Sequence, residues 1–187
     1  MKVLAVLDHP RRDSLCGAIL DEFVIGLSEK GHGSEIADLY REGFDPRMTT
    51  DDEPDWNDTN KIYSKAVLDE QVRISRNDAI VFVFPIWWWS FPAMTKGWID
   101  RVWNNGWAYG AKKLPHKKAL LIGVGSGSEE GYNKRGYAEA MRVQTQQGIL
   151  DYCGIADAKI QILYGALDSA ETRQSLLALS HKLGREF

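Results

Sequence analysis

The chain has 187 residues, of which 44% are hydrophobic and 26% are charged. This length is enough for a sizeable core, and we expect a single domain over residues 1–187. The 23 basic and 26 acidic residues leave a net charge of −3, which argues against nucleic acid or an anionic membrane surface as the main partner.

The cysteines and the N-terminal residues indicate in which cellular compartment the protein is located. Cys16 and Cys153 show no spacing typical of a metal or redox motif, so we expect two reduced thiols and no metal site. The apolar start, MKVLAVLDHP, is too short for a signal peptide, and no apolar run approaches the roughly 20 residues that span a bilayer. The sequence therefore predicts a cytoplasmic protein that does not insert into a membrane.

Short apolar runs and segments with helical spacing alternate along the chain. A strand is predicted at 3–7, a helix at 17–30 and a second strand at 34–40, followed by an acidic loop at 41–59. Then come a helix at 60–76, a strand at 78–84, a helix at 93–103 and a strand at 119–124. A loop rich in glycine and serine at 125–136 leads to a helix at 137–152, a strand at 158–164 and a helix at 170–183.

Five strands with helices between them predict an α/β fold, a parallel sheet covered on both faces. The commonest doubly wound order of five strands is 2-1-3-4-5, and ligands bind such sheets outside the carboxyl ends of the strands, near the switch between strands 1 and 3. This rule selects three loops, at 9–16, 85–92 and 125–132.

The first of these loops, HPRRDSLC, leads into a helix whose N-terminus can stabilise an anion. Ser14 can add a hydroxyl group, and His9, Arg11 and Arg12 can add donors or charge. The alternative is an ordinary serine cap with solvated arginines.

The second loop lies in FPIWWWSFPAMTKGWID, which starts at Phe84, and six of the seven tryptophans fall between Trp87 and Trp107. Three consecutive tryptophans cannot all face one core, and the flanking prolines exclude a central strand. We expect the backbone N–H groups at Ile86 to Trp89 to bond the heteroatoms of a planar ring while an indole packs on it. An apolar patch at a dimer interface is the alternative, and both can hold.

The third loop, GSGS from Gly125, allows the backbone to approach a ligand closely.

Phosphate donors together with a flat aromatic surface at this switch point predict a flavin mononucleotide moiety. The chain resembles the flavodoxin-like NAD(P)H quinone oxidoreductases, which include the smaller flavoproteins attached to bacterial potassium-efflux systems. The resemblance runs nearly end to end. It is carried by His9 with Ser14, by Asp38-Leu-Tyr40 and Phe44-Asp-Pro46, by residues 84–110, by GSGS with Tyr132, and by residues 148–154.

The resemblance implies a homodimer with two flavin sites at its interface and a ping-pong hydride transfer, from NAD(P)H to flavin N5 and then to a quinone or similar acceptor. It also implies a role for each matching residue. His9, Ser14, Leu15 and Cys16 would hold the flavin phosphate; Pro85, Ile86, Trp87, Trp88 and Trp89 would cradle the isoalloxazine ring, with Gly125, Ser126 and Gly127 along its other edge. Tyr109 would line the substrate pocket of the partner chain, and Tyr132 would bond the pyrimidine end of the ring, where negative charge builds up.

Two positions depart from the family pattern. Cys16 stands where asparagine is common, and a backbone N–H group can still serve the phosphate there. No histidine follows Tyr132 within a few residues, and Lys134 or Arg135 can supply the positive charge instead.

Asp38-Leu-Tyr40, Phe44-Asp-Pro46 and the long loop after them resemble the FAD-using branch, which favours FAD slightly over FMN. The choice between NADH and NADPH and the physiological acceptor stay open.

Three other functions stay open. The chain can be a regulatory flavoprotein subunit of a potassium-efflux transporter, a structural dimer without a cofactor, or a one-electron carrier such as a flavodoxin. Such carriers are usually strongly acidic, so a net charge of −3 fits them poorly.

Overall fold

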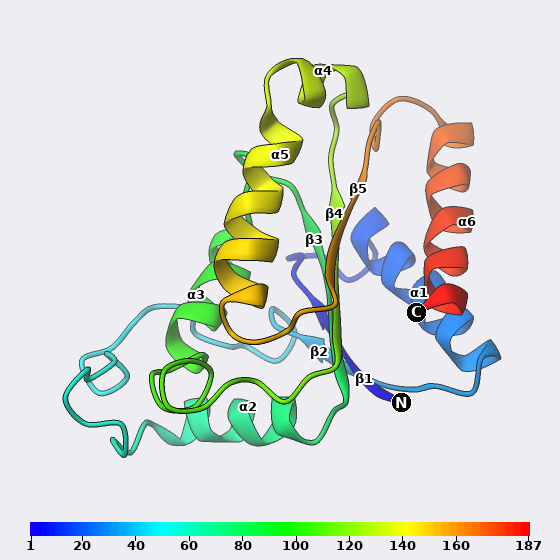
Figure 1. Cartoon of the computed structure of the whole chain (residues 1–187). Coiled ribbons are helices and arrows are strands. Elements are labelled where there is room, and N and C mark those ends of the chain that lie inside the picture. Colours follow the sequence, from blue (N-terminus) through cyan, green and yellow to red (C-terminus); the bar gives the residue numbers. More distant parts are fainter.

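Five parallel strands form one sheet in the order β2-β1-β3-β4-β5 in the computed structural model, which describes residues 1–187 (Figure 1). The predicted order is thus confirmed. The strands are β1 (Lys2–Leu7), β2 (Gly33–Asp38), β3 (Ala79–Pro85), β4 (Lys118–Val124) and β5 (Ala158–Leu163). All seven residues of the central β3 are buried, as expected of a strand with helices on both sides.

Helices cover both faces of the sheet, and alternate strand residues feed the two resulting cores. In β1, Val3, Ala5 and Leu7 point to one core, whereas Leu4 and Val6 point to the other. Helices α1 (Leu15–Glu29) and α6 (Ala170–Glu186) pack together on the first side (Figure 1). The second side carries α2 (Lys65–Ser75), α3 (Ala93–Val102), α5 (Tyr137–Met141) and η1 (Arg142–Asp151), and α4 (Glu129–Lys134) lies beyond the carboxyl end of β4.

Four helices begin directly after a serine whose hydroxyl oxygen accepts a hydrogen bond from an N–H group of the first turn. These caps are Ser14 for α1, Ser64 for α2, Ser128 for α4 and Ser169 for α6. They correct two sequence predictions. The second helix starts at Lys65 rather than at residue 60, and residues 129–134, predicted as loop, form the short α4.

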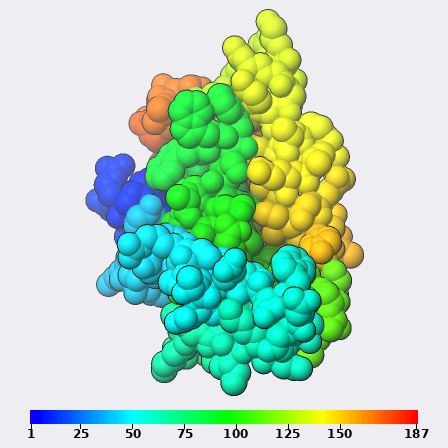
Figure 2. All heavy atoms as spheres, turned by 90° about the vertical axis from the view of Figure 1, so that its left-hand side faces the viewer, coloured from blue at the N-terminus to red at the C-terminus, as the bar shows by residue number.

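The long segment between β2 and α2, predicted as an acidic loop, is anchored by a buried ion pair. Asp52 is fully buried, and its Oδ2 lies 2.6 Å from Nη2 of Arg101, which is 5% exposed. Thr49 and Ser64 also donate to the Asp52 carboxylate. Figure 2 shows this segment, in cyan, against the α3 region, in green. Asp52 therefore ties the segment to α3.

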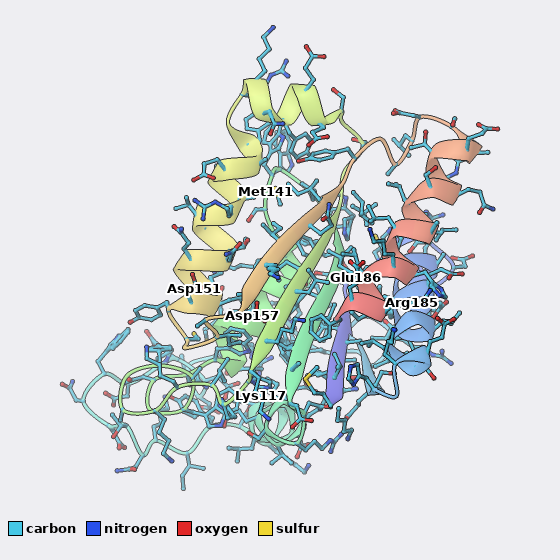
Figure 3. The ribbon with its side chains drawn as sticks, turned by 45° about the vertical axis from the view of Figure 1, so that its right-hand side comes forward. Lys117, Met141, Asp151, Asp157, Arg185 and Glu186 are labelled. Atoms are coloured by element: carbon cyan, nitrogen blue, oxygen red, sulfur yellow. The ribbon has the colours of Figure 1, made fainter.

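The predicted helix at 137–152 is continuous but changes its hydrogen-bond pattern. It begins as α5 and continues from Arg142 as the π-helix η1; Figure 3 labels Met141, where the change occurs, and Asp151 at the far end. The side-chain hydroxyl of Thr145 donates to the Met141 carbonyl oxygen at 2.7 Å. Such a segment is uncommon and often lies near a functional site.

Cys16 and Cys153 are both buried and unpaired. Burial raises the pKa of Cys16 to about 12 and that of Cys153 to about 11, so both thiols stay protonated at neutral pH. None of the helices has the length and apolar character needed to cross a membrane.

Candidate functional site

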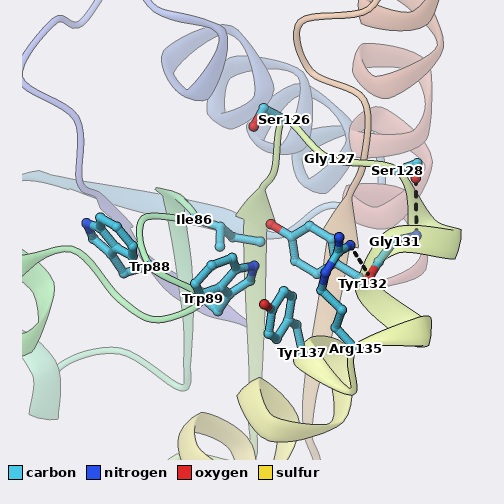
Figure 4. A pocket seen from close by; sticks show the side chains of 10 residues that line it. All are labelled: Ile86, Trp88, Trp89, Ser126, Gly127, Ser128, Gly131, Tyr132, Arg135 and Tyr137. Atoms are coloured by element: carbon cyan, nitrogen blue, oxygen red, sulfur yellow. Dashed lines mark hydrogen bonds between the residues drawn. The ribbon is translucent and has the colours of Figure 1, made fainter.

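A cavity of about 700 Å³ opens at the carboxyl ends of β3 and β4 (Figure 4). It brings together parts of the second and third predicted loops with α4 and the start of α5. Its lining residues are Ile86, Trp88, Trp89, Ser126, Gly127, Ser128, Gly131, Tyr132, Arg135 and Tyr137. The position agrees with the rule that parallel sheets bind ligands outside the carboxyl ends of their strands.

The tryptophan run forms a strained tight turn. The Ser90 N–H group donates to the Trp87 carbonyl oxygen at 3.2 Å, and Trp88 and Trp89 between them have φ of 52° and 53°. This mirror-image turn normally needs glycine, asparagine or aspartate, and a bulky residue with positive φ is a genuine outlier. Strain of this kind persists mainly at functional sites, so the turn marks the wall of the cavity as a site.

The three consecutive indoles lie in three different environments, two of them against another ring and one exposed. The Trp87 ring lies 6.5 Å from the His9 ring, measured between centroids. Trp88 is 86% exposed, and Trp89 lies with its ring 4.1 Å from that of Tyr137. One predicted backbone donor is already engaged, because the Ile86 N–H group bonds the Val124 carbonyl oxygen at 2.8 Å. It is not free for a ligand, which leaves the three tryptophan amides of the predicted set.

Tyr132 stands at the back of the cavity, and two glycines make room for it. A Cβ atom on Gly125 would lie 2.9 Å from the Tyr132 hydroxyl oxygen, and one on Gly127 would lie 3.0 Å from its ring. The ring also packs edge to face against Tyr164, at 5.2 Å between centroids. Tyr132 is 7% exposed, and burial raises the pKa of its hydroxyl group. The resemblance placed Gly125 and Gly127 along an edge of the flavin ring; in the structure both lie against Tyr132, and Gly127 also lines the cavity.

Arg135 is the cation of the cavity. It lines the wall, and its Nη1 donates only weakly to the Gly131 carbonyl oxygen, at 3.4 Å. Lys134, the other predicted cation, is exposed and lies outside the lining. Among the lining residues in Figure 4, hydrogen bonds join Ser128 and Arg135 to Gly131, and none holds the Tyr132 hydroxyl group. Both groups therefore remain available to a ligand.

The predicted phosphate loop lies beside the tryptophan turn, where His9 faces Trp87, but none of its residues lines the cavity. The His9 Nδ1 atom lies 3.1 Å from the Arg11 backbone nitrogen and 3.0 Å from the Arg11 carbonyl oxygen, so the loop itself orients the ring. The Ser14 hydroxyl group is buried as the cap of α1, and Leu15 and Cys16 form its first turn. Arg12 pairs with Asp21 and is not free for an anion.

Tyr109 lies elsewhere. It belongs to the connection between α3 and β4, at the amino ends of the strands, and lines a separate cavity of about 390 Å³ together with Met48 and Cys153. Its ring is 5.7 Å from that of Trp56. The structure does not bring Tyr109 and Tyr132 together within one chain.

The sequence analysis missed Ser128, Gly131 and Tyr137 as lining residues. Ser128 and Gly131 lie in the predicted third loop, at 125–132, but had no assigned role. Tyr137 was predicted only as a helix start, although an aromatic residue directly after Gly136, which has φ of 72°, could have signalled a chain reversal toward the site. Pro85, the last residue of β3, is buried and only supports the turn.

Comparisons of the sequence with known proteins agree on one family. Residues 1–183 match the family described as having a flavodoxin-like fold. The chain is 40% identical to the uncharacterized NAD(P)H oxidoreductase YcaK of Escherichia coli, over 87% of this chain and 83% of that protein. It is 34% identical to the mouse (Mus musculus) ribosyldihydronicotinamide dehydrogenase [quinone], over 95% and 87%.

The structural comparison agrees. The NAD(P)H:quinone oxidoreductase of Methanothermobacter marburgensis superimposes with a TM-score of 0.95 at 32% identity, covering 100% of this chain and 95% of that one. With the cavity, the strained turn and the buried tyrosine already in place, these matches show that the chain is an oxidoreductase and belongs to the flavodoxin-like NAD(P)H quinone oxidoreductase family.

Proposed function

We propose that the protein is a flavin-dependent NAD(P)H:quinone oxidoreductase that works by a ping-pong mechanism, with FAD as the flavin. The observation that carries this proposal is the cavity beside Trp88 and Trp89, in which Tyr132 and Arg135 converge without strong partners. The quinone named for the mouse relative and for the archaeal structure supports the choice of acceptor.

The residues present fit a flavin. The strained turn presents two indole faces and tightly curved backbone, and the open backbone at Ser126 and Gly127 forms the facing wall. The phosphate would lie at the N-terminus of α1 beside His9, where the helix dipole favours an anion. When bound there, a flavin would supply the group that takes a hydride from NAD(P)H and passes it to the quinone.

Tyr132 and Arg135 supply the electrostatics. Because burial raises its pKa, the Tyr132 hydroxyl group stays protonated at neutral pH and can donate a hydrogen bond to the pyrimidine end of the ring. Arg135 adds a positive charge on the same side of the cavity. Donors that are already in place stabilise developing negative charge without reorganisation, which is their main catalytic benefit.

A homodimer completes the proposed site, with Tyr109 of one chain contributing to the pocket of the other. Support comes from exposed indoles: Trp88 is 86% exposed and Trp56, beside Tyr109, is 70% exposed. Surfaces of this kind are usually covered by another protein surface or by a ligand.

The direct test starts with the purified protein. It should be yellow with about one flavin per chain, released flavin should be identified as FAD by chromatography, and NAD(P)H should reduce a simple benzoquinone at a rate that depends on that flavin. Light scattering at micromolar concentration should give a dimer. A colourless protein that takes up neither FAD nor FMN would rule out this function.

A further inference from the structure

Asp8 is a buried carboxylate that the proposed mechanism does not use. It directly follows β1 and is 1% exposed. Its Oδ2 accepts hydrogen bonds from the Thr95 N–H group, at 2.7 Å, and from the Thr95 hydroxyl group, at 2.5 Å. Its Oδ1 is buried without a hydrogen-bonding partner in the chain. A carboxylate half satisfied in this way is costly to bury.

The two hydrogen bonds from Thr95 offset part of the free-energy cost of burying the Asp8 carboxylate. Thr95 is the third residue of α3, and the residue that precedes this helix, Pro92, offers no side-chain cap. Asp8 therefore caps α3 from the neighbouring strand, and the helix dipole stabilises its negative charge. Burial raises the pKa of Asp8, whereas the Thr95 bonds and the charge of His9 oppose this rise and favour the ionised form. The result is a charge fixed in place by its backbone and by α3.

This fixed charge lies next to the phosphate loop. Asp8 directly follows β1 and precedes His9, the first residue of the loop that leads into α1. A second carboxylate, Asp38, ends β2 in register with Leu7 and also has one buried oxygen without a partner. The loop that would hold the flavin phosphate therefore starts between two buried acids.

His9 is the cation that acts on Asp8, whereas neither arginine of the loop forms an ion pair with Asp8 or Asp38. Arg12 is bound to Asp21, and the exposed Arg11 points no hydrogen bond or ion pair toward either acid. An anion at the N-terminus of α1 thus meets attraction from the helix dipole and repulsion from Asp8. The balance depends on how much negative charge a single phosphate group carries.

We propose that Asp8 is a cofactor-selectivity residue that disfavours the phosphate monoester of FMN relative to the diphosphate of FAD. This inference rests on the proposed flavin site. A phosphate monoester carries a charge of about −1.5 to −2 at pH 7. Each phosphate group of a diphosphate diester carries a single negative charge, so the group nearest to Asp8 is repelled less. Riboflavin, which has no phosphate, should not respond to Asp8.

The experiment compares three flavins on two proteins. Flavin-depleted wild type and Asp8→Asn are titrated with FAD, FMN and riboflavin at pH 7.5 while flavin fluorescence is followed. The asparagine side chain has nearly the same shape and can still accept from Thr95. We expect Asp8→Asn to tighten FMN binding by about tenfold and FAD binding by about threefold, the size of one charge interaction at partly screened distance, and to leave riboflavin unchanged. Asp13→Asn, which removes an exposed carboxylate from the same loop, should change none of the three.

Two outcomes would overturn the selectivity role. Equal weakening of all three flavins in Asp8→Asn would mean that Asp8 is only a cap for α3. Wild type that binds FMN as tightly as FAD would overturn it without any variant, which covers the case in which Asp8→Asn fails to fold. A protein that binds no flavin would instead reject the proposed function itself, so the two failures are distinguishable.

Discussion

The two helix layers of this protein are built differently, although they share one sheet. The core beneath α1 and α6 is mainly aliphatic, with two aromatic residues among its 18, Phe23 and Phe187. The core beneath α2, α3 and η1 contains six aromatic residues among 25, and the long segment anchored by Asp52 completes it. The aromatic residues Phe91 and Tyr132 extend this second core to the cavity.

Glycines have different roles in the two helix layers. Where α1 crosses α6, a Cβ atom on Gly26 would lie 2.2 Å from the His181 carbonyl oxygen, and one on Gly184 would lie 2.1 Å from that of Phe23. These glycines bring two backbones together. At the end of β4, Gly125 instead makes room for the movable end of a side chain, the Tyr132 hydroxyl group. In the first layer glycines therefore let two helices pack closely, and in the second a glycine makes room for a residue of the site.

The largest effect should come from breaking the anchor of the second layer. Arg101→Met leaves the fully buried Asp52 carboxylate without its cation, which typically costs about 3–5 kcal/mol of unfolding free energy. Urea unfolding should show this loss. Arg142→Met, which removes a solvent-exposed ion pair to Glu139, is the control and should leave the midpoint unchanged. Equal midpoints for the two variants would show that the anchor does not stabilise the layer.

The next effect concerns rate rather than stability. Tyr132→Phe removes the donor that faces the cavity, and flavin reduction by NAD(P)H should slow about 100-fold, as for other preorganised donors. Flavin affinity should change little. Tyr164→Phe is the matched control, because Tyr164 packs on Tyr132 at 5.2 Å but does not line the cavity. Stopped-flow reduction of Tyr132→Phe at the wild-type rate would show that the hydroxyl group only packs.

A pair of glycine substitutions tests the comparison itself. Gly26→Ala places a methyl group against backbone that cannot move away, and we expect a loss of about 2 kcal/mol of unfolding free energy with normal flavin reduction in the folded protein. Gly125→Ala should cost only about 1 kcal/mol, because the displaced atom ends a side chain. Its reduction rate should nevertheless fall roughly tenfold or more, since the Tyr132 hydroxyl group moves. The opposite pattern would invert the roles assigned to the two layers.

The smallest effect is a pH dependence confined to the first layer. Hydrogen bonds to Glu22 and Glu29 raise the pKa of His181 above its ordinary value of 6.5. A raised folded-state pKa stabilises the protein fully below the unfolded-state pKa and less as the pH rises through the folded-state value. Wild type should therefore lose a little stability between pH 6 and pH 8.5 by urea unfolding. In His181→Gln that step should disappear, whereas an identical step in both proteins would assign it to other groups.

The sequence alone determined the frame of the molecule. Apolar runs such as Val3–Leu7 and Asp78–Phe84 can be buried only as strands with both faces covered, and connections that include a helix make neighbouring strands parallel. The order 2-1-3-4-5 was predicted because it is the commonest doubly wound order of five strands, and the candidate loops follow from the strand ends in that order. Local patterns predict strands and helices because each has its own spacing of apolar residues along the chain.

Only the tertiary structure decided which side chains face one another. In the sequence Asp52 is one of several acids in the loop at 41–59, and only the structure pairs it with Arg101, 49 residues away. Gly125 and Tyr132 are close in sequence, yet their contact depends on the cap at Ser128, which turns the chain into α4. Tyr137 reached the cavity only because Gly136 adopts positive φ and the tryptophan turn stands opposite. Long-range pairing and steric fit depend on the placement of whole elements, which no local pattern encodes.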